Sequence, residues 1–287
     1  MGEGIIIKGI GGNYTIFDGK DYHNCVARGI FRKNKVTPLP GDQVEFADGA
    51  INKIFPRRNE FVRPAVSNID QLAFFLPIKY PEPDLYLLDK MLLTAFEKRL
   101  DILLCINKCD CDDTHSYREI DKIYSKLGIK VLLLEAINGR GIDELSENLA
   151  NKITVFAGQS GAGKSTTLNG VFQEEMMQTG SISAKTERGK HTTRHAELFR
   201  YGEGFVVDTP GFSSHDLPDY TASELASLYP EFEEHLGNCR FKECIHINEP
   251  DCAVKNALND EEIDSGRYNR YKKFIDIVAE RKANKYK

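Results

Sequence analysis

Residues that could bind a nucleotide phosphate lie near the middle of the chain. Residues 158–165 read Gly-Gln-Ser-Gly-Ala-Gly-Lys-Ser and follow an apolar segment, residues 153–157. This is the P-loop pattern, in which successive backbone N–H groups at the start of a helix surround the phosphates. We predict that Lys164 bridges the β- and γ-phosphates and that Ser165 binds Mg²⁺. The nucleotide-binding residues predicted here are Gly158, Gln159, Ser160, Gly161, Ala162, Gly163, Lys164, Ser165 and Thr166.

A second motif, which could recognise guanine, comes before this loop. Residues 107–110 read Asn-Lys-Cys-Asp and follow the apolar segment Asp101–Asn107. They fit the N-K-x-D motif of GTPases, in which Asn107, Lys108 and Asp110 would contact the base. The Asp110 carboxylate can accept from guanine N1–H and N2–H₂, whereas adenine would leave it unpaired, so GTP is favoured over ATP. In an ordinary GTPase this motif follows the P-loop. The inverted order predicts a circularly permuted GTPase core.

Two further segments have the residue types and the spacing that are typical of GTPase switch motifs. Asp208-Thr209-Pro210-Gly211 fits D-x-x-G after a predicted strand, so Asp208 should reach Mg²⁺ through water and the Gly211 N–H should contact the γ-phosphate. Residues 189–194 read Gly-Lys-His-Thr-Thr-Arg and lie between the P-loop and D-x-x-G. We expect Thr192 or Thr193 to close on Mg²⁺.

The residue after Gly211 affects the expected rate of hydrolysis. Phe212 occupies the position where Ras-like enzymes have a water-orienting Gln, and a phenyl ring cannot orient water. We therefore expect slow intrinsic hydrolysis. His191 is the local candidate for orienting or deprotonating the attacking water. The alternative is a surface histidine that faces a phosphate or RNA.

A possible metal site lies near the C-terminus. Cys239, Cys244, His246 and Cys252 supply three thiolates and one imidazole within fourteen residues. A Cys₃His set suits a closed tetrahedral zinc site of the structural kind, because four protein ligands leave no open position for catalysis. The spacing lacks a C-x₂-C knuckle, so scattered thiols are the alternative. A bound metal would stabilise a small segment such as this one, which has too little apolar content to form a core of its own.

Composition is that of a globular protein with reduced thiols. The 287 residues are 41% hydrophobic and 28% charged, without an apolar run of the ~18 residues that a membrane span needs. The start, residues 1–5, lacks the basic and apolar regions of a signal peptide. We predict a cytoplasmic protein that does not bind a membrane. Seven cysteines then indicate free thiols or metal ligands.

Charge is unevenly distributed along the chain. The net charge is −5, yet residues 1–64 hold ten Lys/Arg against seven Asp/Glu, and residues 264–287 hold eight against three. Basic ends on an acidic middle suggest that the terminal regions approach nucleic acid. The alternative is that both ends are ordinary solvated faces.

The pattern of predicted elements divides the chain into three domains. Residues 1–64 read as short strands separated by turns, which predicts a small β-barrel; an OB-fold is the commonest five-stranded one. Basic residues interleave with its aromatics, as RNA binding would need, although barrel aromatics are often core. Residues 65–220 alternate apolar strands and amphipathic helices, which predicts a parallel α/β sheet. Residues 221–287 read as a helical zinc-binding domain that ends in a basic helix. The strands expected in the barrel include Gly4–Gly9, Asn13–Asp18, His23–Arg28 and Asp42–Ala47.

Together these residues resemble the RsgA family (also called YjeQ or YloQ), the circularly permuted GTPases that depend on the small ribosomal subunit. The resemblance covers essentially the whole chain. It implies an N-terminal OB-fold, slow hydrolysis of GTP to GDP and phosphate that is stimulated by the 30S subunit, a late role in its maturation through 16S rRNA binding, Mg²⁺ and one structural Zn²⁺. By resemblance, His191 assists hydrolysis and the Cys/His set binds zinc. We expect a monomer.

One motif departs from the family. The guanine-supporting S-A-x segment reads Glu135-Ala136-Ile137. The usual contact is a backbone N–H at the Ala position, so Ala136 remains a predicted nucleotide-binding residue.

Two other classes of protein remain as rivals. A P-loop ATPase or nucleotide kinase would share the phosphate-binding loop, but Asp110 argues against it. An RNA-binding adaptor with a vestigial GTPase core would not need Lys164, Ser165 and Asp208, which are all present.

Overall fold

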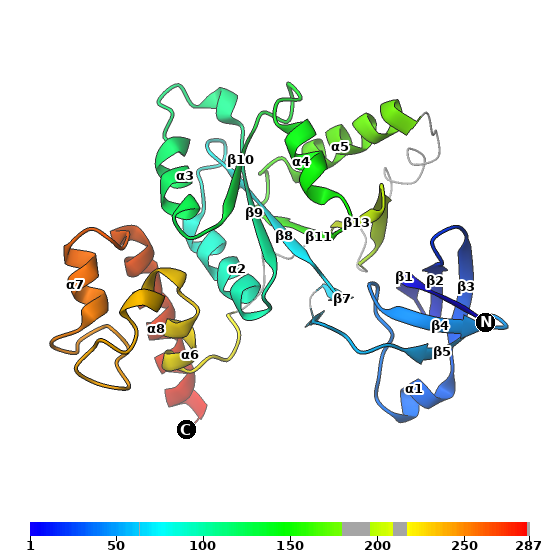
Figure 1. The fold of residues 1–287 in the computed structure, drawn as a ribbon, viewed down its shortest axis with the longest axis horizontal. Coiled ribbons are helices and arrows are strands. Elements are labelled where there is room, and N and C mark those ends of the chain that lie inside the picture. Colours follow the sequence, from blue (N-terminus) through cyan, green and yellow to red (C-terminus); the bar gives the residue numbers. More distant parts are fainter. Residues whose placement is uncertain (63, 180–195, 209–216, 286–287) are drawn as a thin grey trace.

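A closed five-stranded barrel forms the N-terminal unit of the computed structural model, which describes residues 1–62, 64–179, 196–208 and 217–285 (Figure 1). Its strands run in the spatial order β1-β2-β3-β5-β4. Ile6, Ile16, Val44 and Ile51 are fully buried inside it. The barrel strands are β1 (Gly2–Ile10), β2 (Asn13–Phe17), β3 (Tyr22–Ala27), β4 (Gln43–Ala47) and β5 (Ala50–Ile54), with helix α1 (Gly29–Lys33) between β3 and β4.

The barrel confirms the predicted β-domain but contains a helix that the pattern did not indicate. Helix α1 buries none of its side chains, so its sequence has no apolar face to reveal it. The four predicted strands agree with β1 to β4 within two residues at each end. Strand β5 completes the closure by pairing with both β3 and β4.

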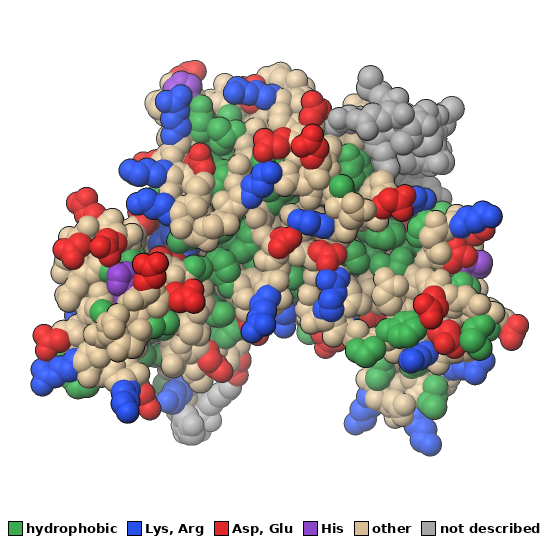
Figure 2. All heavy atoms as spheres, in the orientation of Figure 1, with side chains coloured by type: hydrophobic (Ala, Val, Ile, Leu, Met, Phe, Trp, Pro, Cys, Tyr) green, Lys and Arg blue, Asp and Glu red, His purple; other side chains and the backbone are tan. Residues whose placement is uncertain are grey.

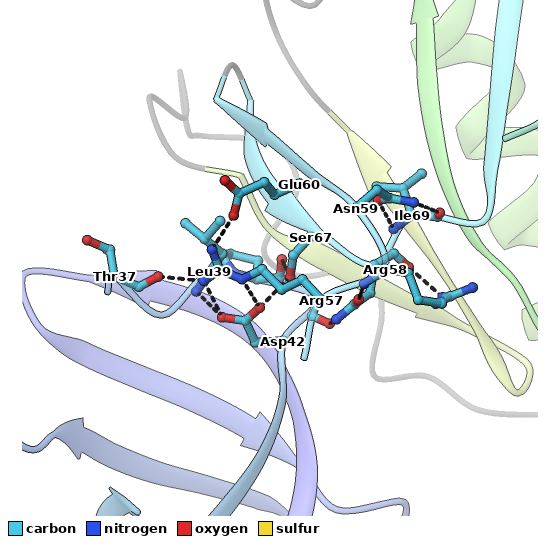
Figure 3. Close-up of polar contacts among 12 residues, drawn as sticks. Thr37, Leu39, Asp42, Arg57, Arg58, Asn59, Glu60, Ser67 and Ile69 are labelled. Atoms are coloured by element: carbon cyan, nitrogen blue, oxygen red, sulfur yellow. Dashed lines mark hydrogen bonds and ion pairs between the residues drawn. The ribbon is translucent and has the colours of Figure 1, made fainter. Parts of the chain in front are cut away.

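A charged junction leads from the barrel into the central sheet. The chain there forms the hairpin β6 (Glu60–Val62) and β7 (Ala65–Ser67). The Asp42 carboxylate is fully buried; it accepts from Arg57 Nε at 2.7 Å and from Ser67 Oγ at 2.6 Å (Figure 3). A buried charge is tolerated only when it is paired and hydrogen-bonded, so this cluster fixes the hairpin against the barrel.

The central unit is a six-stranded sheet in the order β10-β9-β8-β11-β13-β12. All neighbouring pairs are parallel except β12 with β13, which is antiparallel at the edge. One hydrophobic cluster packs α2 and α3 against the sheet, and a second includes residues of α4 and α5. The strands are β8 (Gln71–Pro77), β9 (Asp101–Asn107), β10 (Lys130–Leu134), β11 (Ile153–Gly158), β12 (Leu198–Tyr201) and β13 (Gly204–Asp208); the helices are α2 (Leu85–Glu97), η1 (Cys109–Cys111), α3 (Tyr117–Ser125), α4 (Ile142–Leu149) and α5 (Lys164–Thr179).

The C-terminal unit is helical, and its hydrophobic core also includes Leu93 of α2. It comprises α6 (Ala222–Ser227), the 3₁₀ helix η3 (Pro230–His235), α7 (Ala253–Asn259) and α8 (Ser265–Lys285). Tyr229, Phe232, Tyr271 and Phe274 pack together in its centre, each at most 1% exposed. Within the described residues, none of the helices combines the length and apolar character that crossing a membrane requires.

The barrel and the C-terminal helices lie at opposite ends of the central sheet (Figure 1). Both project to the same side, and the surface between them is hollowed (Figure 2). Acidic and basic side chains are mixed over the face shown. The molecule is therefore an arch with the α/β unit at its crown.

Candidate nucleotide-binding site and candidate metal centre

The predicted nucleotide-binding residues gather at one edge of the central sheet. Asn107 ends β9, Gly158 ends β11 and Asp208 ends β13, while Ala136 follows β10. These strands are parallel, so their carboxyl ends meet at the same edge, where ligands bind in open α/β sheets. The structure thus brings the guanine motif and the P-loop together, although they lie in the reverse of the usual order along the chain.

The side chain of Asn107 joins three loops at this edge. It is 1% exposed; its Nδ2 donates to the Ala162 carbonyl oxygen at 2.9 Å and its Oδ1 accepts from the Ala136 N–H at 3.2 Å. Gly163 packs directly against it, with φ +89° and no room for a Cβ, which would lie 2.3 Å from Asn107 Nδ2. Asn107 therefore holds the guanine motif, the P-loop and the 135–137 segment in one arrangement.

The other two residues of the guanine motif differ in their surroundings. Lys108 has a left-handed backbone conformation, φ 65°, and its Nζ donates to the Tyr80 carbonyl oxygen. Asp110 lies in η1 and is exposed, so a base placed over the sheet edge can reach it. Burial raises the pKa of the neighbouring Cys109 to about 11, so this thiol is protonated at neutral pH.

The P-loop has a backbone that only glycine allows at its first position. Gly158 has φ +135°, and a Cβ there would lie 2.2 Å from the Phe75 carbonyl oxygen. Lys164 Nζ donates to the carbonyl oxygens of Gly158 and Gln159 at 2.7 and 2.9 Å. Ser160, Ser165 and Thr166 are exposed. Ser165 and Thr166 stand at the start of α5, where backbone N–H groups favour an anion.

One contact of the P-loop was not predicted. The Gln159 side chain accepts from the Asp84 N–H at 2.7 Å and donates to the Glu82 carbonyl oxygen at 2.8 Å. It therefore ties the loop to a segment 75 residues earlier in the chain. A P-loop motif assigns this position only a backbone role, so nothing in the local sequence indicates the side-chain contact.

The departure from the S-A-x segment has a local structural explanation. Glu135 Oε1 accepts from Arg140 at 2.7 Å, and the two residues also bond through their backbones at 3.1 Å. Residues 135–140 thus form a closed loop. The N–H of Ala136, expected to contact guanine, donates to Asn107 Oδ1 in this structure.

Several predicted residues fall outside what the structure describes. Thr193, His191 and Gly211 lie in segments 180–195 and 209–216, outside the described residues. Asp208 ends β13, and its side chain is likewise outside the described part.

Comparison with known proteins supports the same interpretation. A family model described as the RsgA GTPase matches residues 54–218, and one described as the RsgA N-terminal domain matches residues 3–53. The chain belongs to the RsgA GTPase family. Members of this family hydrolyse GTP, so the chain is a GTP-hydrolysing enzyme that uses a guanine nucleotide.

Relatives of known sequence and structure match nearly the whole chain. The "Small ribosomal subunit biogenesis GTPase RsgA" of Ruminiclostridium cellulolyticum is 49% identical, covering 94% of this chain and 92% of that protein. The protein of the same name from Alkaliphilus metalliredigens is 42% identical, with 99% of each covered. The crystal structure of YjeQ from Thermotoga maritima superposes with a TM-score of 0.84 at 33% identity, covering 96% of this chain and 98% of that chain. The crystal structure of YloQ, described as a circularly permuted GTPase, superposes with a TM-score of 0.82 at 34% identity. The match covers 98% of this chain and 96% of that chain.

The four predicted metal ligands converge in the C-terminal unit. The ligand atoms of Cys239, Cys244, His246 and Cys252 all lie within 4.8 Å of one another. His246 Nδ1 is 3.4 Å from Cys252 Sγ and 3.6 Å from Cys239 Sγ, and the two Sγ atoms are 3.9 Å apart. Tetrahedral zinc with Zn–S bonds of about 2.3 Å would place neighbouring sulfurs about 3.8 Å apart, so the residues fit this metal.

Burial around the cluster disfavours the charged forms of its side chains. Burial raises the pKa of Cys244 to about 12, against a lowering by the His246 backbone N–H, and burial lowers the pKa of His246. A bound cation would favour the thiolate and the neutral imidazole. The loop is also fixed from α8, because the hydroxyls of Tyr268 and Tyr271 each donate to a loop carbonyl oxygen, of His246 and Ile245, at 2.6 Å.

Proposed function

We propose that this GTPase acts in the maturation of the small ribosomal subunit. The observation that carries the proposal is the meeting of a guanine motif with a P-loop in permuted order, flanked by a barrel and a Cys₃His cluster. Relatives that match nearly the whole chain are named small ribosomal subunit biogenesis GTPases. GTP would be hydrolysed to GDP and phosphate at the sheet edge.

The proposed nucleotide site uses the loops at that edge. Asp110 would pair with the guanine base, and Lys164 would leave the loop carbonyls for the β- and γ-phosphates. Mg²⁺, when bound, would neutralise charge on these phosphates. Ser165 and Thr193 would hold the ion directly, and Asp208 would hold it through a water molecule. His191 is proposed to orient the attacking water. The full proposed set is Asn107, Lys108, Asp110, Ala136, Gly158, Gln159, Ser160, Gly161, Ala162, Gly163, Lys164, Ser165, Thr166, Thr193, Asp208 and Gly211, with His191 as the catalytic residue.

The Cys₃His cluster is proposed to hold one structural zinc ion. Its four ligands would complete a tetrahedral coordination, which leaves no position for a reacting water. The metal would organise residues 239–252, and Tyr268 and Tyr271 would pass that order to α8.

The proposed partner is the 30S subunit with its 16S rRNA. The division into an RNA-binding barrel (1–64), a GTPase domain (65–220) and a zinc domain (221–287) would place basic segments at both ends of the arch. The hollow between them offers a concave surface for a folded RNA (Figure 2). We expect a cytoplasmic monomer that does not bind a membrane.

Co-sedimentation with ribosomal subunits tests this role. We propose that hydrolysis releases the factor. We therefore expect the protein with a non-hydrolysable GTP analogue to pellet with 30S subunits, and the GDP form to bind them more weakly. The 50S subunit serves as the control. Equal binding of both nucleotide forms would contradict the release step, and equal binding to both subunits would contradict the proposed partner.

A further inference from the structure

The segment of residues 80–84 is bonded to both nucleotide-binding motifs. Gln159 of the P-loop holds it by two side-chain hydrogen bonds, at 2.7 Å to the Asp84 N–H and at 2.8 Å to the Glu82 carbonyl oxygen. Lys108 of the guanine motif donates to the Tyr80 carbonyl oxygen. Pro81 lies against Gly161, where an added Cβ would be 3.2 Å from Pro81 Cδ. A change at either motif therefore reaches this segment through direct contacts.

The same segment starts helix α2. The Asp84 carboxylate caps the helix, its Oδ1 accepting from the Leu87 N–H at 2.8 Å. Helix α2 then runs along the sheet with Leu88 and Met91 at most 1% exposed. A packed helix moves largely as one body, so displacement of its first turn is carried to its remaining turns.

Helix α2 is joined to the C-terminal unit by a buried ionic cluster. Asp89 is 1% exposed; its Oδ1 pairs with Arg267 of α8 at 2.5 Å and its Oδ2 pairs with Arg270. Arg267 also pairs with Glu231 of η3 at 2.5 Å. The Tyr86 ring stacks on Phe274 with centroids 4.7 Å apart. Buried charges that satisfy one another resist separation, because removing one partner leaves the other uncompensated.

We propose that Gln159 is a positioning residue that couples nucleotide binding at the P-loop to the C-terminal unit, through residues 80–84, helix α2 and the Asp89–Arg267 pair. This route consists of residues that the structure describes. It does not follow the direct chain connection from the D-x-x-G motif to residue 217. Its last step reaches residues 239–252, the metal loop, where Tyr268 of α8 donates to the His246 carbonyl oxygen at 2.6 Å. The proposal rests on nucleotide binding by the P-loop and does not depend on the ribosomal partner.

Replacing Gln159 by Met tests the proposal, because Met keeps the length of the side chain and removes both hydrogen bonds. Both hydrogen bonds join parts of the protein to each other and not to the nucleotide, so their loss is measured at the C-terminal unit and not as a GTP affinity. In the wild-type protein, saturating GDP should slow amide hydrogen exchange in residues 265–278. In Gln159→Met at saturating GDP, we expect this slowing to be lost in residues 265–278 while the P-loop itself remains protected.

Gln173→Met is the matched control, because Gln173 is an exposed Gln of helix α5, which follows the P-loop. It should retain the wild-type exchange response. If Gln159→Met does not fold, Gln159→Asn, whose shorter carboxamide cannot reach both partners, replaces it. Equal slowing of hydrogen exchange in residues 265–278 in the wild-type protein and the Gln159 variants would overturn the proposal. Failure of the wild-type protein to bind GDP would instead contradict the proposed nucleotide site.

Discussion

Asn107 illustrates how one residue of a recognition motif can also organise the site. Its carboxamide is buried and bonds two other loops, so it is not free to act only on a base. Asp110, three residues later, is exposed at the sheet edge. Asn107 thus fits the role of a brace that sets the distance between guanine motif and P-loop, and Asp110 fits that of the residue that selects the base.

Base selection by Asp110 predicts a change of specificity in Asp110→Asn. The amide would no longer accept from both guanine N1–H and N2–H₂, but could donate to the 2-oxo group of xanthine. We expect preference to shift from GDP to xanthosine diphosphate, measured as dissociation constants for the two nucleotides. No shift would remove Asp110 from guanine recognition.

The brace formed by Asn107 predicts that Gly163→Ala abolishes nucleotide binding. A Cβ at this position would lie 2.3 Å from Asn107 Nδ2, on a backbone with φ +89°, so the P-loop and the guanine motif must separate. Binding of a fluorescent GDP analogue measures the effect.

Gly170→Ala is the control for this substitution. Gly170 lies in the interior of α5, and its Cβ would make ordinary contact with Ile142, 3.5 Å away. It should bind normally. Normal binding by Gly163→Ala would show that the two loops tolerate separation.

At the scale of elements, the metal loop lacks regular structure of its own between η3 and α7. Zinc at the Cys₃His cluster would supply the missing constraint. We predict one zinc ion per chain in protein purified without added metal, lost in Cys244→Ser and retained in Cys25→Ser, whose thiol lies in the barrel. Elemental analysis provides the measurement. Zinc-free wild-type protein with a folded C-terminal unit would contradict the assignment.

The buried pair of Asp89 with Arg267 predicts a large loss of stability in Asp89→Ala. Removing one partner of a buried ion pair costs about 3–5 kcal/mol. The exposed pair of Asp101 with Lys152 is the control, since such pairs contribute about 0–1 kcal/mol. We expect Asp89→Ala, but not Asp101→Ala, to lower the urea midpoint of unfolding measured by circular dichroism. Equal midpoints would mean that the cluster does not stabilise the interface.

At this scale the sequence predicts single helices and strands, but not the contacts between residues that lie far apart in the chain. The apolar segment Asp101–Asn107 agrees with β9 to the residue, because an apolar run carries its own signal. Hairpin β6–β7 was not predicted, because its three-residue strands are too short to show an alternation of apolar and polar residues. The Asp89–Arg267 pair escaped because its members lie 178 residues apart. The Gln159 contact was hidden for the same reason.

At the scale of the whole molecule, the barrel is joined to the edge of the central sheet. Lys8 pairs with Glu197 at 2.8 Å, Phe17 meets Phe205 edge-on, and the guanidinium of Arg200 lies 4.8 Å from the Phe17 ring centre. The C-terminal unit is joined at the opposite side through α2. Both ends of the arch are therefore attached to the central α/β unit, as a nucleotide-controlled grip on a large RNA would require.

The central claim is that the 30S subunit is both partner and activator of this GTPase, and GTP turnover by the purified protein tests it most directly. Turnover is measured alone, with 30S subunits and with 50S subunits. The account predicts slow turnover alone, strong stimulation by 30S subunits and none by 50S subunits. Turnover that neither particle changes would contradict it.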